Sequence, residues 1–216
     1  MPSASRPNAR GRRSLGTLLL ATLLADFLAF ALMIAGVEGF RVVSPGASSL
    51  NEALAADLHI SHSFLVVCVL AALAAAAAAA RGRDRRAIAI VFVAVVSHWP
   101  LDVISHPPDM ALAPGAHTVF GLGLWRSRPL TLIVEGAPWA LAVILYARAT
   151  RSTHLAGTLA FWGVAAFLTL AWFGNISGSS LPPTPKAMGI SSGIFFTLVV
   201  AWAYWMNRQR VPAGVT

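Results

Sequence analysis

The chain has 216 residues, of which 57% are apolar and 11% are charged, and its mean hydropathy is +0.70. This composition excludes an ordinary soluble domain, and the length exceeds what a single membrane anchor needs. The formal charge of +8 does not indicate nucleic-acid binding, because the basic residues occur in short clusters between apolar segments, where they determine membrane topology. The sequence therefore predicts a polytopic membrane protein without a nucleic-acid partner.

Residues 1–14 carry four arginines among proline, serine, asparagine and glycine, which is typical of a short disordered basic tail. Six apolar segments follow, each near the ~20 residues that a helix needs to cross a bilayer. They cover residues 15–38, 58–80, 87–106, 129–148, 154–173 and 190–207. The first is expected to be a retained helix, since it is longer than a signal-peptide core and contains Asp26. The expected fold is all-α, with one six-helix transmembrane domain over residues 15–207 and a tail at 208–216.

The basic residues between the helices orient this six-span arrangement. With the N-terminus in the cytoplasm, twelve arginines fall on the cytoplasmic side, and only Arg41, Arg126, Arg128 and Lys186 fall outside. This asymmetry follows the positive-inside rule. Both termini are therefore expected in the cytoplasm, and the tail at 208–216 is expected to be cytoplasmic.

Ionisable residues gather where this arrangement places the outer ends of the helices. A charged residue at a helix centre costs ~2.5–3.5 kcal/mol on insertion scales, so several of them together indicate a function. Asp57, His59 and His62 open the second helix, and Glu38 closes the first helix on the same side. Asp26 lies deeper, near mid-span. It is either a protonated carboxyl bonded to a neighbouring helix or a proton-relay or inner group of a site.

The third helix continues this polar set. His98 and Asp102 are four residues apart, so on a helix their side chains lie on one face. His106 and Asp109 prolong the stripe if the helix persists, although the two prolines between them favour a break. Glu135, about two turns into the fourth helix, completes a ring of side chains from four helices.

Such a ring suits a divalent metal. Imidazole and carboxylate ligands point to zinc, with manganese or iron as alternatives. A cysteine-based zinc site is excluded, because Cys68 is the only cysteine. The proposed metal ligands are His59, His62, His98 and Asp102. The candidates for a general base are Glu135, Asp109 and Glu38. The residues expected to support the ligands by hydrogen bonds are Ser63, His106, Asp26 and Asp57.

Three segments carry a resemblance to a known family. They read HISHSF at 59–64, SHWPLDVISHPPD at 97–109 and GLGLW at 121–125. Together they resemble bacterial integral membrane proteins catalogued as predicted membrane-bound metal-dependent hydrolases, relatives of the inner-membrane LexA-binding proteins. In that group an S-H-S and an H-x-x-x-D are taken as the metal-binding signature, which here matches His62 with Ser63 and His98 with Asp102. The resemblance covers about residues 20–140 and implies a multi-pass protein of the bacterial inner membrane. The second and third segments also look like a subgroup left uncharacterised or called permeases.

The polar set and the resemblance together predict a metal-dependent hydrolase whose site opens to the outer face. Its expected partners are membrane lipids and an unidentified small-molecule or lipid-linked substrate. A transporter or permease for a proton or divalent cation is an alternative, since the same groups can bind a passing ion. A non-catalytic membrane scaffold is the third. Ionisable residues become sparse toward the cytoplasm, which favours a one-sided site over transport.

Overall fold

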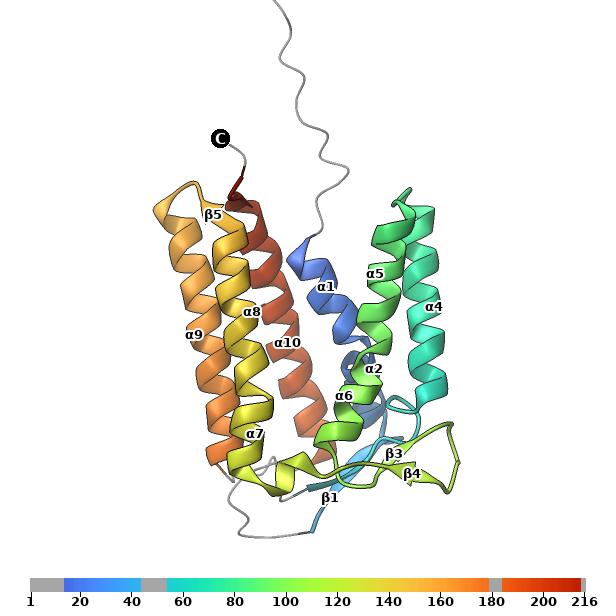
Figure 1. Cartoon of the computed structure of the whole chain (residues 1–216). Coiled ribbons are helices and arrows are strands. Elements are labelled where there is room, and N and C mark those ends of the chain that lie inside the picture. Colours follow the sequence, from blue (N-terminus) through green and yellow to red (C-terminus); the bar gives the residue numbers. More distant parts are fainter. Residues whose placement is uncertain (1–13, 44–53, 179–183, 215–216) are drawn as a thin grey trace, which may run out of the picture.

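Figure 1 shows the computed structural model, which describes residues 14–43, 54–178 and 184–214. The protein is mostly helical, at 69%. Four of the described helices are long and apolar enough to cross a membrane, and a bent pair of helices makes a fifth candidate. The predicted tail at residues 1–14 lies outside the described residues except for Ser14. The sequence and the structure agree on a protein built from apolar helices that could cross a membrane.

The four long helices follow one another along the chain, and two of them contain a local break. They are Arg85–Ser105, made of α5 (Arg85–Val96) and α6 (His98–Ser105); Arg128–Ala149, made of α7 (Arg128–Val134) and α8 (Gly136–Ala149); α9 (Leu155–Ser177); and α10 (Pro185–Arg208). The breaks fall at Ser97 and Glu135, both next to or within the predicted polar set.

The first apolar segment forms the bent pair. Its parts are α1 (Leu15–Thr22) and α2 (Leu24–Ala35). Their axes differ by 51°, so the prediction of one continuous helix over residues 15–38 is wrong. Oγ1 of Thr22 donates to the carbonyl of Leu19, a back-bond that bends helices. The pair ends at Gly36, whose φ of +76° is the left-handed conformation that terminates helices.

The second apolar segment forms α4 (Phe64–Ala80), a helix of 17 residues that begins later than the predicted residue 58. Residues 59–62 form a turn instead, so His59 and His62 do not have helical spacing. The carboxylate of Glu38 explains the difference, because it accepts hydrogen bonds from the backbone N–H groups of Ile60 and Ser61. These two donors are therefore satisfied by a side chain, while the N–H groups of His62 and Ser63 close the turn on the carbonyls of Leu58 and Ile60.

Three short antiparallel strand pairs, which the all-α prediction did not include, connect helix ends. They pair β1 (Gly39–Val42) with β2 (Leu54–Asp57), β3 (Met110–Ala111) with β4 (Val119–Phe120), and β5 (Thr150–Ser152) with β6 (Arg210–Pro212). A 3-10 turn, η2 (Leu124–Arg126), precedes α7. Figure 1 shows β1, β3 and β4 at one end of the helices and β5 at the other. The predicted tail at 208–216 therefore begins with the end of α10 and a paired strand, and residues 215–216 lie outside the described part.

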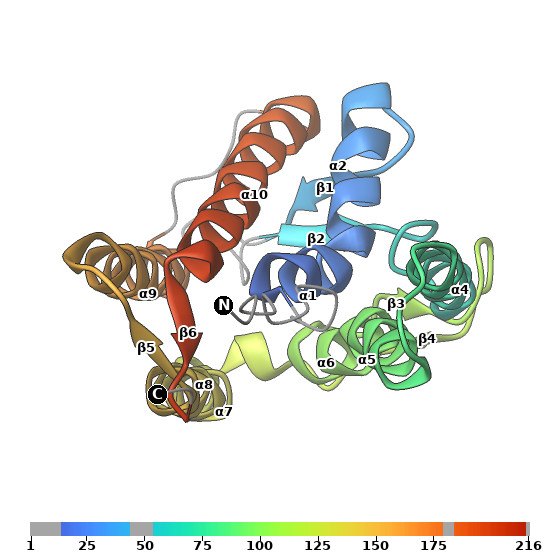
Figure 2. The same cartoon turned by 90° about the horizontal axis from the view of Figure 1, so that it is seen from above.

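The bent pair occupies the middle of the helical assembly. Figure 2 shows α1 between α10 on one side and α5 on the other, and both contacts are close. Small residues form the core where α1 and α2 meet α4 and α5; it consists of Ala21, Ala25, Val67, Ala71 and Val95. A second core joins α9 to α10 and contains Ala160, Phe161, Val164 and Met206. Two of the helices that the sequence assigned to the polar set thus pack against the bent pair, α4 against α2 and α5 against α1.

Arg210 links β6 to β5, the strand between α8 and α9, through hydrogen bonds to Thr150. It is only 7% exposed, and its guanidinium donates from Nε and Nη2 to Oγ1 and the carbonyl of Thr150, at 2.8 and 2.9 Å. Its Cζ lies 4.6 Å from the ring centroid of Phe161. The side chain therefore combines two hydrogen bonds with a cation–π contact.

The variant Arg210→Ala should lower the free energy of unfolding by about 2 kcal/mol, because it removes the cation–π contact and both hydrogen bonds to Thr150. Arg210→Lys should lie between this variant and wild type, since lysine keeps the charge and loses the planar fork. Thermal unfolding in detergent measures both, with exposed Arg208→Ala as the control. Equal melting temperatures for Arg210→Ala and wild type would contradict this role.

Candidate metal centre

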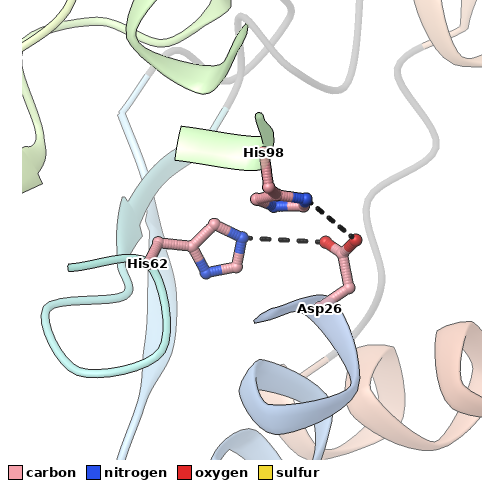
Figure 3. Close-up of side chains that lie close together, drawn as sticks. All are labelled: Asp26, His62 and His98. Carbon is pink, nitrogen blue, oxygen red and sulfur yellow. Dashed lines mark ion pairs between the residues drawn. The ribbon is translucent and has the colours of Figure 1, made fainter. Parts of the chain in front are cut away.

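Asp26, His62 and His98 lie close together and could hold a metal ion, since each offers a ligand atom and these atoms lie within 4.8 Å of one another. They come from α2, from the turn before α4 and from the start of α6 (Figure 3). Oδ1 of Asp26 is 3.7 Å from Nε2 of His62, and Oδ2 is 3.9 Å from Nδ1 of His98. The bend in the first helix and the delayed start of α4 bring these three side chains to one level.

Asp102 is the fourth member of this cluster. Its Oδ2 lies 3.0 Å from Nε2 of His98 and 3.8 Å from Nε2 of His62. Oδ2 of Asp102 and Nε2 of His98 are both buried, and neither makes a hydrogen bond with any described residue. The two atoms therefore approach each other without the alignment that a hydrogen bond requires. Two ligands at 2.0–2.2 Å from a tetrahedral ion lie roughly 3.3–3.6 Å apart, and the distances at Asp102 bracket this value.

The orientation of His98 is fixed by the backbone of the bent helix. Nδ1 of the ring is 2.7 Å from the carbonyl oxygen of Thr22, at the end of α1. A carbonyl can only accept, so this hydrogen bond places the ring proton on Nδ1 and leaves a lone pair on Nε2. Hydrogen bonds of this kind hold metal-binding histidines in one tautomer. Nε2, which faces Asp102, is therefore the ligand atom that this geometry favours.

His62 is held by its own turn. Only 5% of its side chain is exposed, and its Nδ1 is 2.9 Å from Oγ of Ser61, which leaves Nε2 directed at the two carboxylates. Ser63 donates from Oγ to the carbonyl of Ile60 and so closes the turn without touching the imidazole. Glu38, 5% exposed, anchors the same turn through Oε1, as described above. The S-H-S motif thus shapes one turn around one candidate ligand.

The charge of the cluster also suits a cation. With neutral imidazoles, Asp26 and Asp102 bring two negative charges into a small space that is largely shielded from solvent. Buried charges are costly unless they are paired or bind a metal. No lysine or arginine forms an ion pair with either carboxylate in the described parts of the chain. A divalent ion would offset both charges.

His59 and Asp57 lie apart from the cluster. Nδ1 of His59 is 3.0 Å from Oδ1 of Asp57, and the two side chains are 46% and 63% exposed. The pair belongs to the exposed end of β2 and the following turn, where the chain has not yet entered α4. The structure therefore brings His62, but not His59, to the other candidate ligands.

His106 and Asp109 form a separate pair. The helix ends at Ser105, just before the two consecutive prolines, so the polar stripe leaves the helix there. Nδ1 of His106 is 3.2 Å from Oδ1 of Asp109, and the imidazole lies 4.3 Å from the ring of Trp125. Both side chains are largely buried. The backbone N–H of His106 donates to the carbonyl of Asp102 at 2.7 Å, but no ion pair or side-chain hydrogen bond joins this pair to the cluster among the described residues.

Glu135 accepts three side-chain hydrogen bonds from three other segments. Trp125 and Trp172 each donate from Nε1 at 2.8 Å, and Ser105 donates from Oγ at 3.3 Å. The sequence did not identify the two tryptophans as partners of Glu135; a carboxylate within an apolar span was the available signal. Glu135 thus ties the end of α6 to α7, α8 and α9. Neither Glu135 nor Glu38 bonds to the cluster within the described residues.

Comparisons with protein-family models, with curated proteins and with solved structures found no match. The resemblance of the three motifs to metal-dependent hydrolases therefore stays a prediction. What carries the functional argument is the geometry of the cluster, in which two imidazoles and two carboxylates from three segments, α2, the turn before α4 and α6, face one another.

Proposed function

We propose that the protein is a membrane-embedded metal-dependent hydrolase of the bacterial inner membrane, with six spans and both termini in the cytoplasm. In this arrangement α4 crosses the membrane in addition to the five candidate spans described above. The end of the helices that carries β1 and β3 faces outward. The observation that carries the proposal is the group of Asp26, His62 and His98, which could hold one metal ion, together with Asp102, whose Oδ2 lies 3.0 and 3.8 Å from the two imidazoles. Zinc is the preferred ion for such ligands.

The four groups divide into ligands and a base. A catalytic zinc takes about three protein ligands and keeps one position open. Either carboxylate can complete a set with the two imidazoles, and the tautomer that Thr22 imposes on His98 favours Asp102, next to Nε2. Asp26, which faces both imidazoles, would then be the general base in place of Glu38, Asp109 and Glu135, which do not bond to the cluster. A metal held here supplies Lewis-acid activation of water and of an ester, amide or phosphoester.

An apolar seal supports hydrolysis over transport. Ala21 and Ala25 precede Asp26 on the bent helix, Val67 follows His62 on α4, and Val95 precedes His98 on α5; all are at most 5% exposed and pack together. In the six-span arrangement they all lie on the cytoplasmic side of the cluster. An ion would have to cross this packed layer, whereas a hydrolase needs access from one side only.

Purified protein loaded with zinc should cleave at least one of a panel of chromogenic carboxyl esters and phosphodiesters, or a component of an inner-membrane lipid extract followed by mass spectrometry. Asp26→Asn should lower turnover by about 10²–10⁴-fold while metal remains bound, as expected for a general base. His59→Ala is the matched control and should keep full activity. Zinc flux into proteoliposomes without any cleavage would favour the transporter and overturn the proposal.

A further inference from the structure

A groove of about 540 Å³ lies between α1, α4 and α5, with Tyr204 of α10 at its edge. This volume falls within the ~300–1,000 Å³ that is typical of small-molecule sites. Most of its wall is apolar and includes Leu18, Leu24, Leu70, Leu73, Ala78 and Val91. Ala21 belongs both to this wall and to the apolar core beneath the metal cluster, so the groove is separated from the cluster by packed side chains.

One end of the groove is polar and basic. Arg81 and Arg83 lie there, in the turn between α4 and α5, at the end of the helices where β5 also lies in Figure 1. Arg81 donates one guanidinium N–H to the carbonyl of Ala77 at 3.0 Å, which holds the side chain against the end of α4. Asp84 is also at the rim, but its carboxylate accepts the N–H of Ala87 and caps α5. The cationic groups therefore dominate the charge of this rim.

We propose that this groove binds an anionic phospholipid, with the phosphate against Arg81 and Arg83 and one acyl chain along the apolar wall. Charge complementarity selects this occupant: a basic rim joined to an apolar trough matches an anionic headgroup joined to a hydrocarbon chain. Arginine suits phosphate because its planar fork donates two parallel hydrogen bonds. In the six-span arrangement the rim faces the cytoplasmic leaflet, whose surface is anionic.

The headgroup is tested by titrating delipidated protein with phosphatidylglycerol and with phosphatidylcholine, followed by native mass spectrometry. Wild type should prefer phosphatidylglycerol. The double variant Arg81→Gln/Arg83→Gln should raise its Kd about 30-fold, as expected for two basic residues near a membrane surface. Arg85→Gln/Arg86→Gln removes the same charge from the adjacent start of α5, outside this groove, and should change Kd less than about fivefold. Equal affinities for the two lipids would overturn the proposal.

The acyl chain is tested by filling the trough. Ala78→Phe should weaken binding of both lipids, whereas Ala76→Phe, an exposed position outside this groove on the same helix, should not. Free sn-glycerol 3-phosphate should fail to displace phosphatidylglycerol, since it has no chain to bury. An unchanged Kd in Ala78→Phe would contradict the proposal. A change in the oligomeric mass of this variant would also contradict it, because the groove would then be assigned to a second copy of the chain. Zinc binding should be unaffected in every one of these variants. The lipid-binding proposal and the metal-centre proposal are therefore tested independently of each other.

Discussion

Replacing His98 with alanine should abolish tight binding of a divalent metal by the purified protein, whereas replacing His59 should leave binding unchanged. His98 is the ligand that the structure fixes best, because Thr22 holds its ring and Asp102 lies 3.0 Å from Nε2. Losing a group that only orients a ligand costs ~10–100-fold in metal affinity, so losing the ligand itself should cost more. His59 is the matched control, since it is an exposed histidine three residues from His62 and pairs with Asp57.

The measurement is zinc content by mass spectrometry of detergent-purified protein, followed by competition with a chromophoric chelator. His62→Ala should match His98→Ala, and Asp102→Asn should lose most of the bound zinc. Asp26→Asn should keep zinc, in agreement with its assignment as the base. If Asp26→Asn loses zinc and Asp102→Asn keeps it, the two carboxylates exchange roles. Equal zinc content in wild type and both histidine variants would remove the metal centre altogether.

The sequence predicts the apolar segments well, because length and hydropathy are local properties. The segments expected at 154–173 and 190–207 correspond to α9 and α10, with ends that differ by a few residues. The bend after Thr22 was not predictable in the same way. Threonine occurs in many straight helices, and the bend matters here because the ring of His98, 76 residues away, bonds to the carbonyl of Thr22. Such a contact is a property of tertiary packing.

The residues of the candidate site also differ in whether local sequence spacing predicts their positions. The four-residue spacing of His98 and Asp102 predicts that their side chains meet on one helical face, and they do. His59 and His62 have a comparable spacing, but they fall in a turn that Glu38 holds open, so only His62 turns inward. The acceptor that anchors this turn, Oε1 of Glu38, lies 22 residues before Ile60 in the chain, beyond any local pattern.

Asp26 and Glu135 show why depth alone does not assign a role. Both are acidic residues within apolar segments, and the sequence predicts Glu135 as a candidate general base and Asp26 as a supporting residue. In the structure Asp26 faces two imidazoles, whereas Glu135 accepts hydrogen bonds from Trp125, Trp172 and Ser105. Indole and hydroxyl donors occupy the hydrogen-bonding sites of this carboxylate, so it is not free to bind a metal. The partners decide between the two roles, and the partners come from other helices.

The position of Asp26 depends on how closely α10 approaches α2, and glycine permits this approach. A Cβ at Gly189 would lie 2.8 Å from the carbonyl oxygen of Phe30 and 3.1 Å from side-chain atoms of Met33 and Ile34. Gly193 follows four residues later beside the ring of Phe30, which gives the small-residue spacing that lets helices pack closely in lipid. Phe30 lies one turn beyond Asp26 on α2, so a displacement here moves the carboxylate.

The variant Gly189→Leu should therefore lower the free energy of unfolding by about 1–3 kcal/mol, the usual cost of overpacking, and weaken zinc binding by at least ~10-fold. Gly174→Leu is the control, because a Cβ at that position in α9 meets no atom within 4 Å, and leucine should stabilise the helix slightly. Thermal unfolding and chelator competition on the same samples separate the two effects. If Gly189→Leu loses stability and keeps wild-type zinc affinity, the packing of α10 supports the fold without positioning the metal centre.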